Sequence, residues 1–180
     1  MNLEIGLISA KEAFTSLFDK LLSTIEKEEV DDHIRENMIG DVSWSLKSYI
    51  KNKTRFCLPM GGIVYVTYQQ EIVAISCMEK NDSLMKDAVL IGVRMWVRKD
   101  FRGKFLHSLY LLPEQEKWAK ESGAKRVFMT FNESSRKSLY RHILDRDHSG
   151  STYESRWDGY QSLGLVQFNY TQQYVIYKEL

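Results

Sequence analysis

The segment 88–131 constrains the fold more than any other part of this sequence. It begins with the apolar, β-branched run AVLIGVRMWV at 88–97, which predicts a strand. A basic turn at 98–104 and a helical pattern to about Ser122 follow, and a second strand is predicted over 126–131. A connection of this length allows a right-handed crossover between parallel strands. The segment therefore predicts one parallel βαβ unit.

The rest of the chain predicts an antiparallel sheet around that unit. The runs IVYVTY and IVAISCM are separated only by Gln69-Gln70-Glu71, which is typical of a hairpin. With the strand over 88–97 they form an antiparallel meander. We expect an α/β (α+β) fold with a mixed, mostly antiparallel central sheet and helices on both faces. The remaining predicted strands are 3–8 and two around Asn169-Tyr170-Thr171 within 163–179, and the remaining predicted helices are 10–28, 32–51 and 133–144.

The helical part of the crossover carries two punctuating residues. Pro113 stands inside the pattern, so the segment is either one kinked helix or two helices in tandem. Gly123 follows the last periodic residue and is expected to cap the helix at its C-terminus.

Composition narrows the possible functions. A chain of 180 residues fits a single domain, 1–180. Its net charge of +1 argues against a protein that wraps nucleic acid. Cys57 and Cys77 form no CxxC pair, and the four histidines have no metal-ligand spacing, so neither a disulfide framework nor a metal site is expected. Without a membrane-length apolar run or a signal-peptide pattern, we expect a soluble, cytoplasmic protein that contacts neither membrane nor nucleic acid.

The basic turn predicts a phosphate site. A helix begins just after it, and a helix start offers unpaired N–H groups and the positive end of the dipole. The alternative is a solvated strand end with scattered cations. Five cations fall within eleven residues: Arg94, Arg98, Lys99, Arg102 and Lys104.

The same segment resembles the cofactor-binding motif of the GNAT acetyltransferases. Those enzymes have a strand, an Arg/Gln-x-x-Gly-x-Gly/Ala turn, a helix ending in Glu-x-Trp-Ala-x-x-x-Gly-Ala, a second strand and an asparagine. Here VRKDFRGK stands at 97–104, EKWAKESGA at 116–124, and VFMTFN at 127–132.

The resemblance implies transfer of an acetyl or similar acyl group from acetyl-CoA to a primary amine. The acceptor, a small molecule or a peptide, and the choice between monomer and homodimer are not set by it. It further implies a backbone N–H that holds the thioester carbonyl. The residues it assigns to the donor are Met95, Trp96, Val97, Arg102, Gly103, Lys104, Phe105, Leu106, His107 and Asn132.

The sequence departs from the family at the turn. The two family glycines fall at Phe105 and His107, which keep their N–H groups but add bulk. The helix is also one residue longer than usual. The loss of both motif glycines favours the alternative of a non-catalytic module of the same fold that binds acyl-CoA or a protein partner. The retention of Arg102, Gly103, Lys104 and Asn132 favours an enzyme.

The resemblance also implies a tyrosine that protonates the leaving thiolate. Tyr140 follows Asn132 at nearly the family spacing and is preferred; Tyr160, in YQSLGL, is the alternative. Glu79, Asp87 and Glu133 are acids in the region, but none has a context that marks it as the general base.

Overall fold

The computed structural model describes residues 2–9, 23, 61–104, 106–131, 159–168 and 170–180. The chain forms two compact units. The first draws on residues 1–79 and 94–111, and the second on residues 80–93 and 112–180. Apart from Ser23, which is helical, the helices predicted over 10–28, 32–51 and 133–144 lie outside the described residues.

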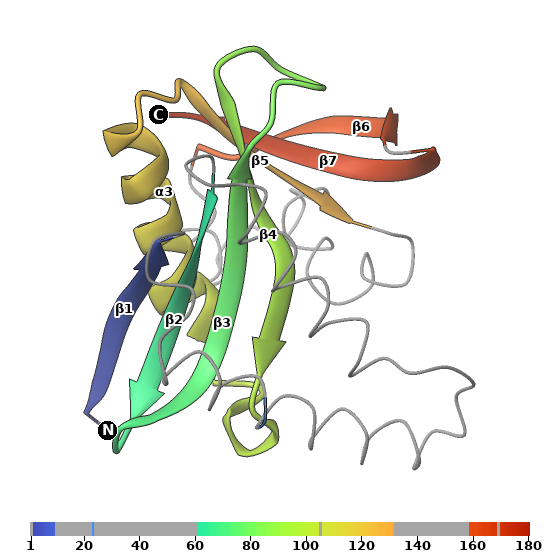
Figure 1. Cartoon of the computed structure of the whole chain (residues 1–180). Coiled ribbons are helices and arrows are strands. Elements are labelled where there is room, and N and C mark those ends of the chain that lie inside the picture. Colours follow the sequence, from blue (N-terminus) through green and yellow to red (C-terminus); the bar gives the residue numbers. More distant parts are fainter. Residues whose placement is uncertain (1, 10–22, 24–60, 105, 132–158, 169) are drawn as a thin grey trace, which may run out of the picture. The chain divides into compact units, whose positions relative to one another are not determined.

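Three neighbouring strands belong mainly to the first unit. They are β1 (Leu3–Ser9), β2 (Gly61–Tyr68) and β3 (Glu71–Lys80), and they lie side by side in Figure 1. β2 pairs antiparallel with both of its neighbours. The first strand and the hairpin predicted from the β-branched runs are therefore confirmed.

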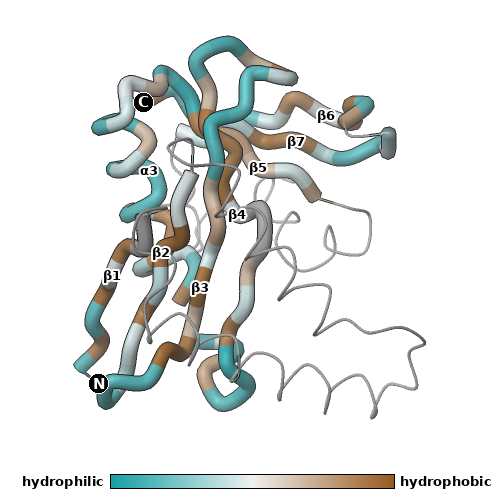
Figure 2. The backbone as a smooth tube through the Cα atoms, in the orientation of Figure 1, coloured by the Kyte–Doolittle hydropathy of each residue, from teal (hydrophilic) through white to brown (hydrophobic). Residues whose placement is uncertain are grey.

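The β2–β3 turn is one residue shorter than the sequence predicted. Gln69 and Gln70 have φ angles of 51° and 66°, the backbone of a type I′ turn, whose twist suits two paired strands. Glu71 is already the first residue of β3 and pairs with Tyr68. The interior of β3 is buried, and Figure 2 shows apolar stretches along it. Polar chemistry on β3 is thus confined largely to its ends.

The parallel crossover is confirmed in the second unit. β4 (Ala88–Val97) pairs in parallel with β5 (Arg126–Phe131), from Ala88↔Arg126 to Leu90↔Phe128. β7 (Thr171–Glu179) is antiparallel to both β5 and β6 (Gln161–Phe168), as Figure 1 shows. The strand order is β1-β2-β3-β4-β5-β7-β6. The predicted mixed, mostly antiparallel sheet is therefore the observed one.

Aromatic packing forms a core in the second unit. The Phe128 and Phe168 rings meet edge to face, with centroids 6.0 Å apart. Leu90 and Val175 are buried in the same cluster. These residues come from β4, β5, β6 and β7, so the core ties the crossover to the C-terminal hairpin.

Helical segments fill the connection between β4 and β5. They are a 3-10 turn, η1 (Lys99–Phe101), a π-helix, η2 (His107–Leu111), and α3 (Leu112–Glu121). α3 follows η2 directly, and Pro113 stands in its first turn. A π-helix accommodates one extra residue within a helical segment, so η2 is a place where the additional residue expected from the sequence can be held.

α3 ends as the sequence predicts. The Gly123 N–H donates to the Lys120 carbonyl and the Ala124 N–H to the Ala119 carbonyl, each at 3.0 Å. This pair of bonds is the Schellman motif, with glycine in the left-handed position. Among the helices of the described segments, none is long and apolar enough to span a membrane.

Candidate functional site

The predicted phosphate turn is an exposed loop of the first unit. Arg102, Gly103 and Lys104 are all exposed. Gly103 has φ +79°, and a Cβ added there would meet nothing within 4 Å. Glycine is therefore required for its backbone conformation and not for lack of space. The backbone of the turn is held by two bonds: the Arg102 N–H donates to the Lys99 carbonyl and the Lys104 N–H to the Phe101 carbonyl, each at 3.3 Å.

Phe101 anchors this turn. Its side chain is buried, and its ring lies 5.5 Å from that of Tyr68 at an angle of 56°. The Arg98 guanidinium lies 4.8 Å from the Phe101 ring centroid, and the Lys104 ammonium lies 4.4 Å from it. Two cation–π contacts therefore join an apolar anchor to the basic residues on either side of the turn.

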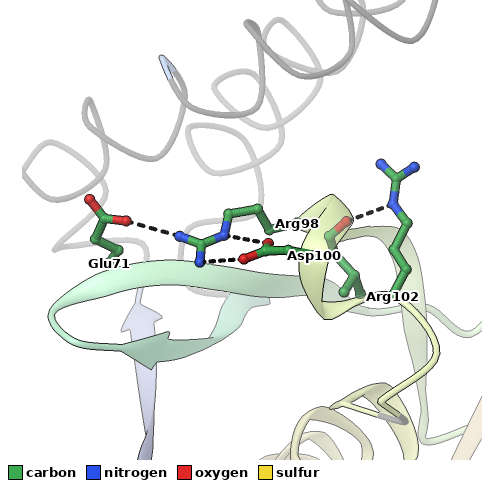
Figure 3. Close-up of polar contacts among 5 residues, drawn as sticks. Glu71, Arg98, Asp100 and Arg102 are labelled. Atoms are coloured by element: carbon green, nitrogen blue, oxygen red, sulfur yellow. Dashed lines mark hydrogen bonds and ion pairs between the residues drawn. The ribbon is translucent and has the colours of Figure 1, made fainter.

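Arg98 is paired with acidic side chains of its own unit. Its Nε and one terminal nitrogen donate to the two carboxylate oxygens of Asp100 at 2.8 and 2.9 Å. Its other terminal nitrogen donates to Glu71 Oε2 at 2.9 Å (Figure 3). The hydrogen bond from Arg98 lowers the pKa of Asp100, and the hydrogen bond to Asp100 raises the pKa of Arg98. Arg98 therefore pairs with two carboxylates, which the prediction of a cluster of five cations did not include.

Arg102 is tied to the end of β4. Its Nε donates to the Val97 carbonyl at 3.0 Å. Figure 3 shows the other two nitrogens of its guanidinium directed away from this contact. The side chain is exposed. The contact thus holds Nε in place, while the two terminal nitrogens of the guanidinium point away from the Val97 carbonyl.

Residues Met95 to Val97 alternate as expected for a strand. Met95 is 41% exposed, Trp96 is buried, and Val97 is half-buried. The buried indole fits the interpretation of Trp96 as core rather than as a ligand through its side chain. Any role of Trp96 toward a donor therefore falls on its backbone.

The start of the helix places bulk inside the protein. Leu106 and His107 are both buried, and Phe105 lies outside the described residues. Burial lowers the pKa of His107 to about 4, so its imidazole is neutral at neutral pH. The bulk that His107 adds where the family has glycine is thus covered by the protein and does not project from the turn.

Tyr160 belongs to the second unit and has a well-defined partner there. Its hydroxyl donates to Glu116 Oε1 at 2.7 Å, and Lys178 Nζ lies 2.7 Å from Glu116 Oε2. Burial, the charge of Glu116 and this hydrogen bond together raise the pKa of Tyr160 well above its ordinary value. A tyrosine in this setting is a weak proton donor. Tyr140 and Asn132 lie outside the described residues.

The acids considered as a general base differ in setting. Glu79 is buried near the end of β3, whereas Asp87 lies 3.3 Å from Lys125 in an ion pair. Glu133 lies outside the described residues. No group of three or more metal-ligating side chains occurs in the part of the chain that the structure describes.

Sequence reasoning missed the partners of two residues that it singled out. Asp100 stands two positions after Arg98 and was visible as a partner. Glu71 was also within reach, because in an antiparallel meander the start of one strand lies beside the end of the next. The pairing of Tyr160 with Glu116 joins residues 44 positions apart, which no local pattern indicates.

Comparison with known proteins places the chain by fold. No family model and no curated protein matches the sequence. Among solved structures, it is similar to a GNAT-family acetyltransferase from Staphylococcus aureus Mu50, with TM-score 0.63, 15% identity, and 98% of this chain and 99% of that chain covered. It is also similar to a ribosomal-protein-alanine N-acetyltransferase from Brucella melitensis, with TM-score 0.59, 14% identity, and coverage of 98% and 99%.

A third solved structure contains the cofactor. The PaiA N-acetyltransferase from Thermoplasma acidophilum, in complex with coenzyme A, matches with TM-score 0.58 and 12% identity over 100% of both chains. At these identities the likeness is one of fold. The resemblance drawn from the sequence motif is therefore confirmed at that level: the chain has the GNAT fold.

Proposed function

We propose that this protein is an N-acyltransferase that moves an acetyl or similar acyl group from acyl-CoA to a primary amine of an acceptor. The GNAT fold and the motif at 97–104 support this proposal together. Fold alone does not assign an activity, so the weight rests on the turn.

The observation that carries the proposal is the Arg102–Gly103–Lys104 turn at the junction of strand and helix. Gly103 takes the left-handed conformation, and two exposed cations flank it. The helix that follows supplies N–H groups of its first turn and the positive end of its dipole. A turn of this chemistry suits the pyrophosphate and 3′-phosphate of CoA, with Arg102 offering a planar fork and Lys104 a compact charge.

The second half of β4 suits the thioester. In the described residues, pairing between β4 and β5 runs only to Leu90↔Phe128, although β4 continues to Val97. Gly92 follows the last paired residue by two positions with φ +65°, an irregularity typical of a bulge. We assign backbone groups of Met95 to Val97 to the pantetheine and to the oxyanion that forms when the amine attacks.

Tyr140 is the proposed proton donor to the leaving thiolate. Its position after Asn132 supports this role, and the raised pKa of Tyr160, with its hydroxyl bonded to Glu116, speaks against the alternative. The acceptor side of the reaction is proposed only as a primary amine on a small molecule or peptide.

One observation favours a second candidate function, a non-catalytic acyl-CoA-binding module. Phe105 and His107 stand where the motif has glycines, and bulk there restricts how closely the backbone approaches phosphate. The burial of the His107 ring removes half of this objection. We therefore place the enzyme first.

A thiol-release assay separates the two functions. Purified protein is incubated with acetyl-CoA and a panel of primary amines, including peptides with free N-termini, and free CoA is measured. The enzyme releases thiol only when an acceptor amine is present. Binding of acetyl-CoA without amine-dependent release across the panel would favour the binding module.

A further inference from the structure

We infer that Arg98 is a positioning residue for the acyl donor: it clamps the η1 turn between Glu71 and Asp100 and thereby sets the geometry of the Arg102–Lys104 turn. This inference rests on the proposed function. It adds to that function an ion-pair cluster that acts on the donor only through the turn.

The clamp joins two segments that are distant in sequence. Glu71 opens β3 directly after the tight Gln69-Gln70 turn, and Arg98 stands directly after β4. The Arg98 N–H also donates to the Val73 carbonyl at 2.8 Å. Backbone and side chain of Arg98 therefore both hold the end of β4 to the start of β3.

On its other side the clamp holds η1. Asp100 lies inside η1 and takes two parallel hydrogen bonds from the guanidinium, a geometry that restricts both side chains (Figure 3). The same guanidinium lies over the Phe101 ring, which is buried. η1 ends at Phe101, and Arg102 is the next residue. The orientation of η1 therefore sets the position of the Arg102 backbone.

The sign of the charges supports this interpretation. Asp100 precedes Arg102 by two residues, and its pKa is lowered mainly by the hydrogen bond from Arg98 and least by the charge of Lys104. A carboxylate at this place repels an incoming phosphate and reduces the field of Lys104. If the turn worked through net positive charge alone, Asp100 would be harmful. We attribute the presence of Asp100 to its two hydrogen bonds with Arg98, which hold η1 in place despite the repulsion of phosphate.

The clamp also requires arginine. The Arg98 side chain is 19% exposed and meets two carboxylates from different directions at once. A planar guanidinium spans both partners with fixed angles, whereas a lysine ammonium offers one point charge on a flexible stem. Lysine would keep the charge and lose the geometry.

The test uses Asp100→Asn, because the two explanations predict opposite signs. Removing a negative charge beside the turn tightens acetyl-CoA binding if charge alone matters. If Asp100 holds the clamp, we expect Asp100→Asn and Arg98→Lys each to bind acetyl-CoA about 5-fold more weakly by calorimetry. The double variant Arg98→Gln/Asp100→Asn should bind no more weakly than Arg98→Gln alone, since both changes break one unit.

The matched control is Glu179→Gln. It removes the same charge from another exposed ion pair, in which Arg126 Nε lies 2.7 Å from Glu179 Oε1 in the second unit. Its acetyl-CoA affinity should equal that of the wild type. Amide exchange supplies a readout that needs no donor: the Arg102 and Lys104 N–H groups, bonded at 3.3 Å to Lys99 and Phe101 carbonyls, should exchange faster in Asp100→Asn and not in Glu179→Gln.

Either equal or tighter binding by Asp100→Asn, or wild-type affinity in Arg98→Lys, overturns the clamp. Unchanged exchange at Arg102 and Lys104 overturns it as well. A wild-type protein that does not bind acetyl-CoA overturns the proposed function and the donor-side role of the clamp with it. Amide exchange then still shows whether the ion pairs hold the turn, so the two failures are told apart.

Discussion

Two clusters of charged and polar side chains in this protein each join three residues, and they differ in how far they are exposed to solvent. In the first unit, Arg98 joins Asp100 and Glu71, whose side chains are 61% and 59% exposed. In the second unit, Glu116 joins Lys178 and the buried Tyr160, with the Glu116 and Lys178 side chains 19% and 27% exposed.

The difference in exposure separates two uses of charge. Exposed ion pairs contribute little to folding free energy, so the Arg98 cluster is better understood as fixing the shape of a turn. The Glu116 cluster is partly withdrawn from water, where removing one partner leaves another unsatisfied. We therefore expect changes in the first cluster to affect ligand binding and changes in the second to affect stability.

The largest predicted effect is the difference in turnover rate between Tyr140→Phe and Tyr160→Phe. Tyr140→Phe should lower the turnover rate of acyl transfer about 100-fold, with little change in the Michaelis constant, because a general acid acts in the transition state. Tyr160→Phe should leave turnover nearly unchanged and reduce the free energy of unfolding by about 1–2 kcal/mol, since it orphans Glu116 Oε1. Steady-state kinetics and urea titration measure the two effects. If Tyr160→Phe were the inactive variant, the contrast between the clusters would fail.

The second largest predicted effect is a loss of folding stability at acidic pH, caused by His107. The His107 pKa is about 4 in the folded protein and about 6.5 in the unfolded chain. The unfolded state therefore binds more protons between these values, and stability falls as the pH is lowered through that window. Between pH 8 and pH 5 the loss should be about 2 kcal/mol. Urea unfolding at both pH values measures it, and His107→Gln should show a smaller difference; an equal difference in that variant would contradict the assignment.

The smallest effect concerns the turn glycine. Gly103→Ala should cost about 1 kcal/mol of stability, because alanine is strained at φ +79° although the space for its Cβ is open. Gly103→Asn should cost less, since asparagine tolerates the left-handed region. Thermal unfolding of both variants checks the order. A loss well above this amount would contradict the open space around Gly103.

Much of the fold was predictable because short stretches of sequence indicate their own secondary structure. Runs such as 126–131 are β-branched and aromatic, and β5 has those bounds. Gly123 marks its helix end by a conformation that other residues adopt at a cost. The β2–β3 turn was less predictable, since Gln69 and Gln70 take a conformation for which Asn-Gly is the usual sequence.

The position of the turn between strand and helix was predictable, and the contacts made within it were less so. The turn at Arg102–Lys104 follows from a motif, whereas the partners of Arg98 and Tyr160 depend on which strands and helices meet. From sequence, the cations near the turn were grouped by charge alone, and Arg98 was not paired with Asp100, two positions away, or with Glu71 in the neighbouring strand. The π-helix η2, which ends two residues before Pro113, could not be predicted either. The sequence shows one extra residue in this segment and does not show how the helix accommodates it.

The central claim is that the Arg102–Lys104 turn binds the phosphates of an acyl donor. The most direct measurement is the melting temperature of the full-length protein with millimolar acetyl-CoA or desulfo-CoA, beside the double variant Arg102→Gln/Lys104→Gln. A ligand that binds only the folded state stabilises it by mass action. We predict that both ligands raise the melting temperature of the wild type and that the double variant loses most of this shift. No shift in the wild type with either ligand would contradict the claim.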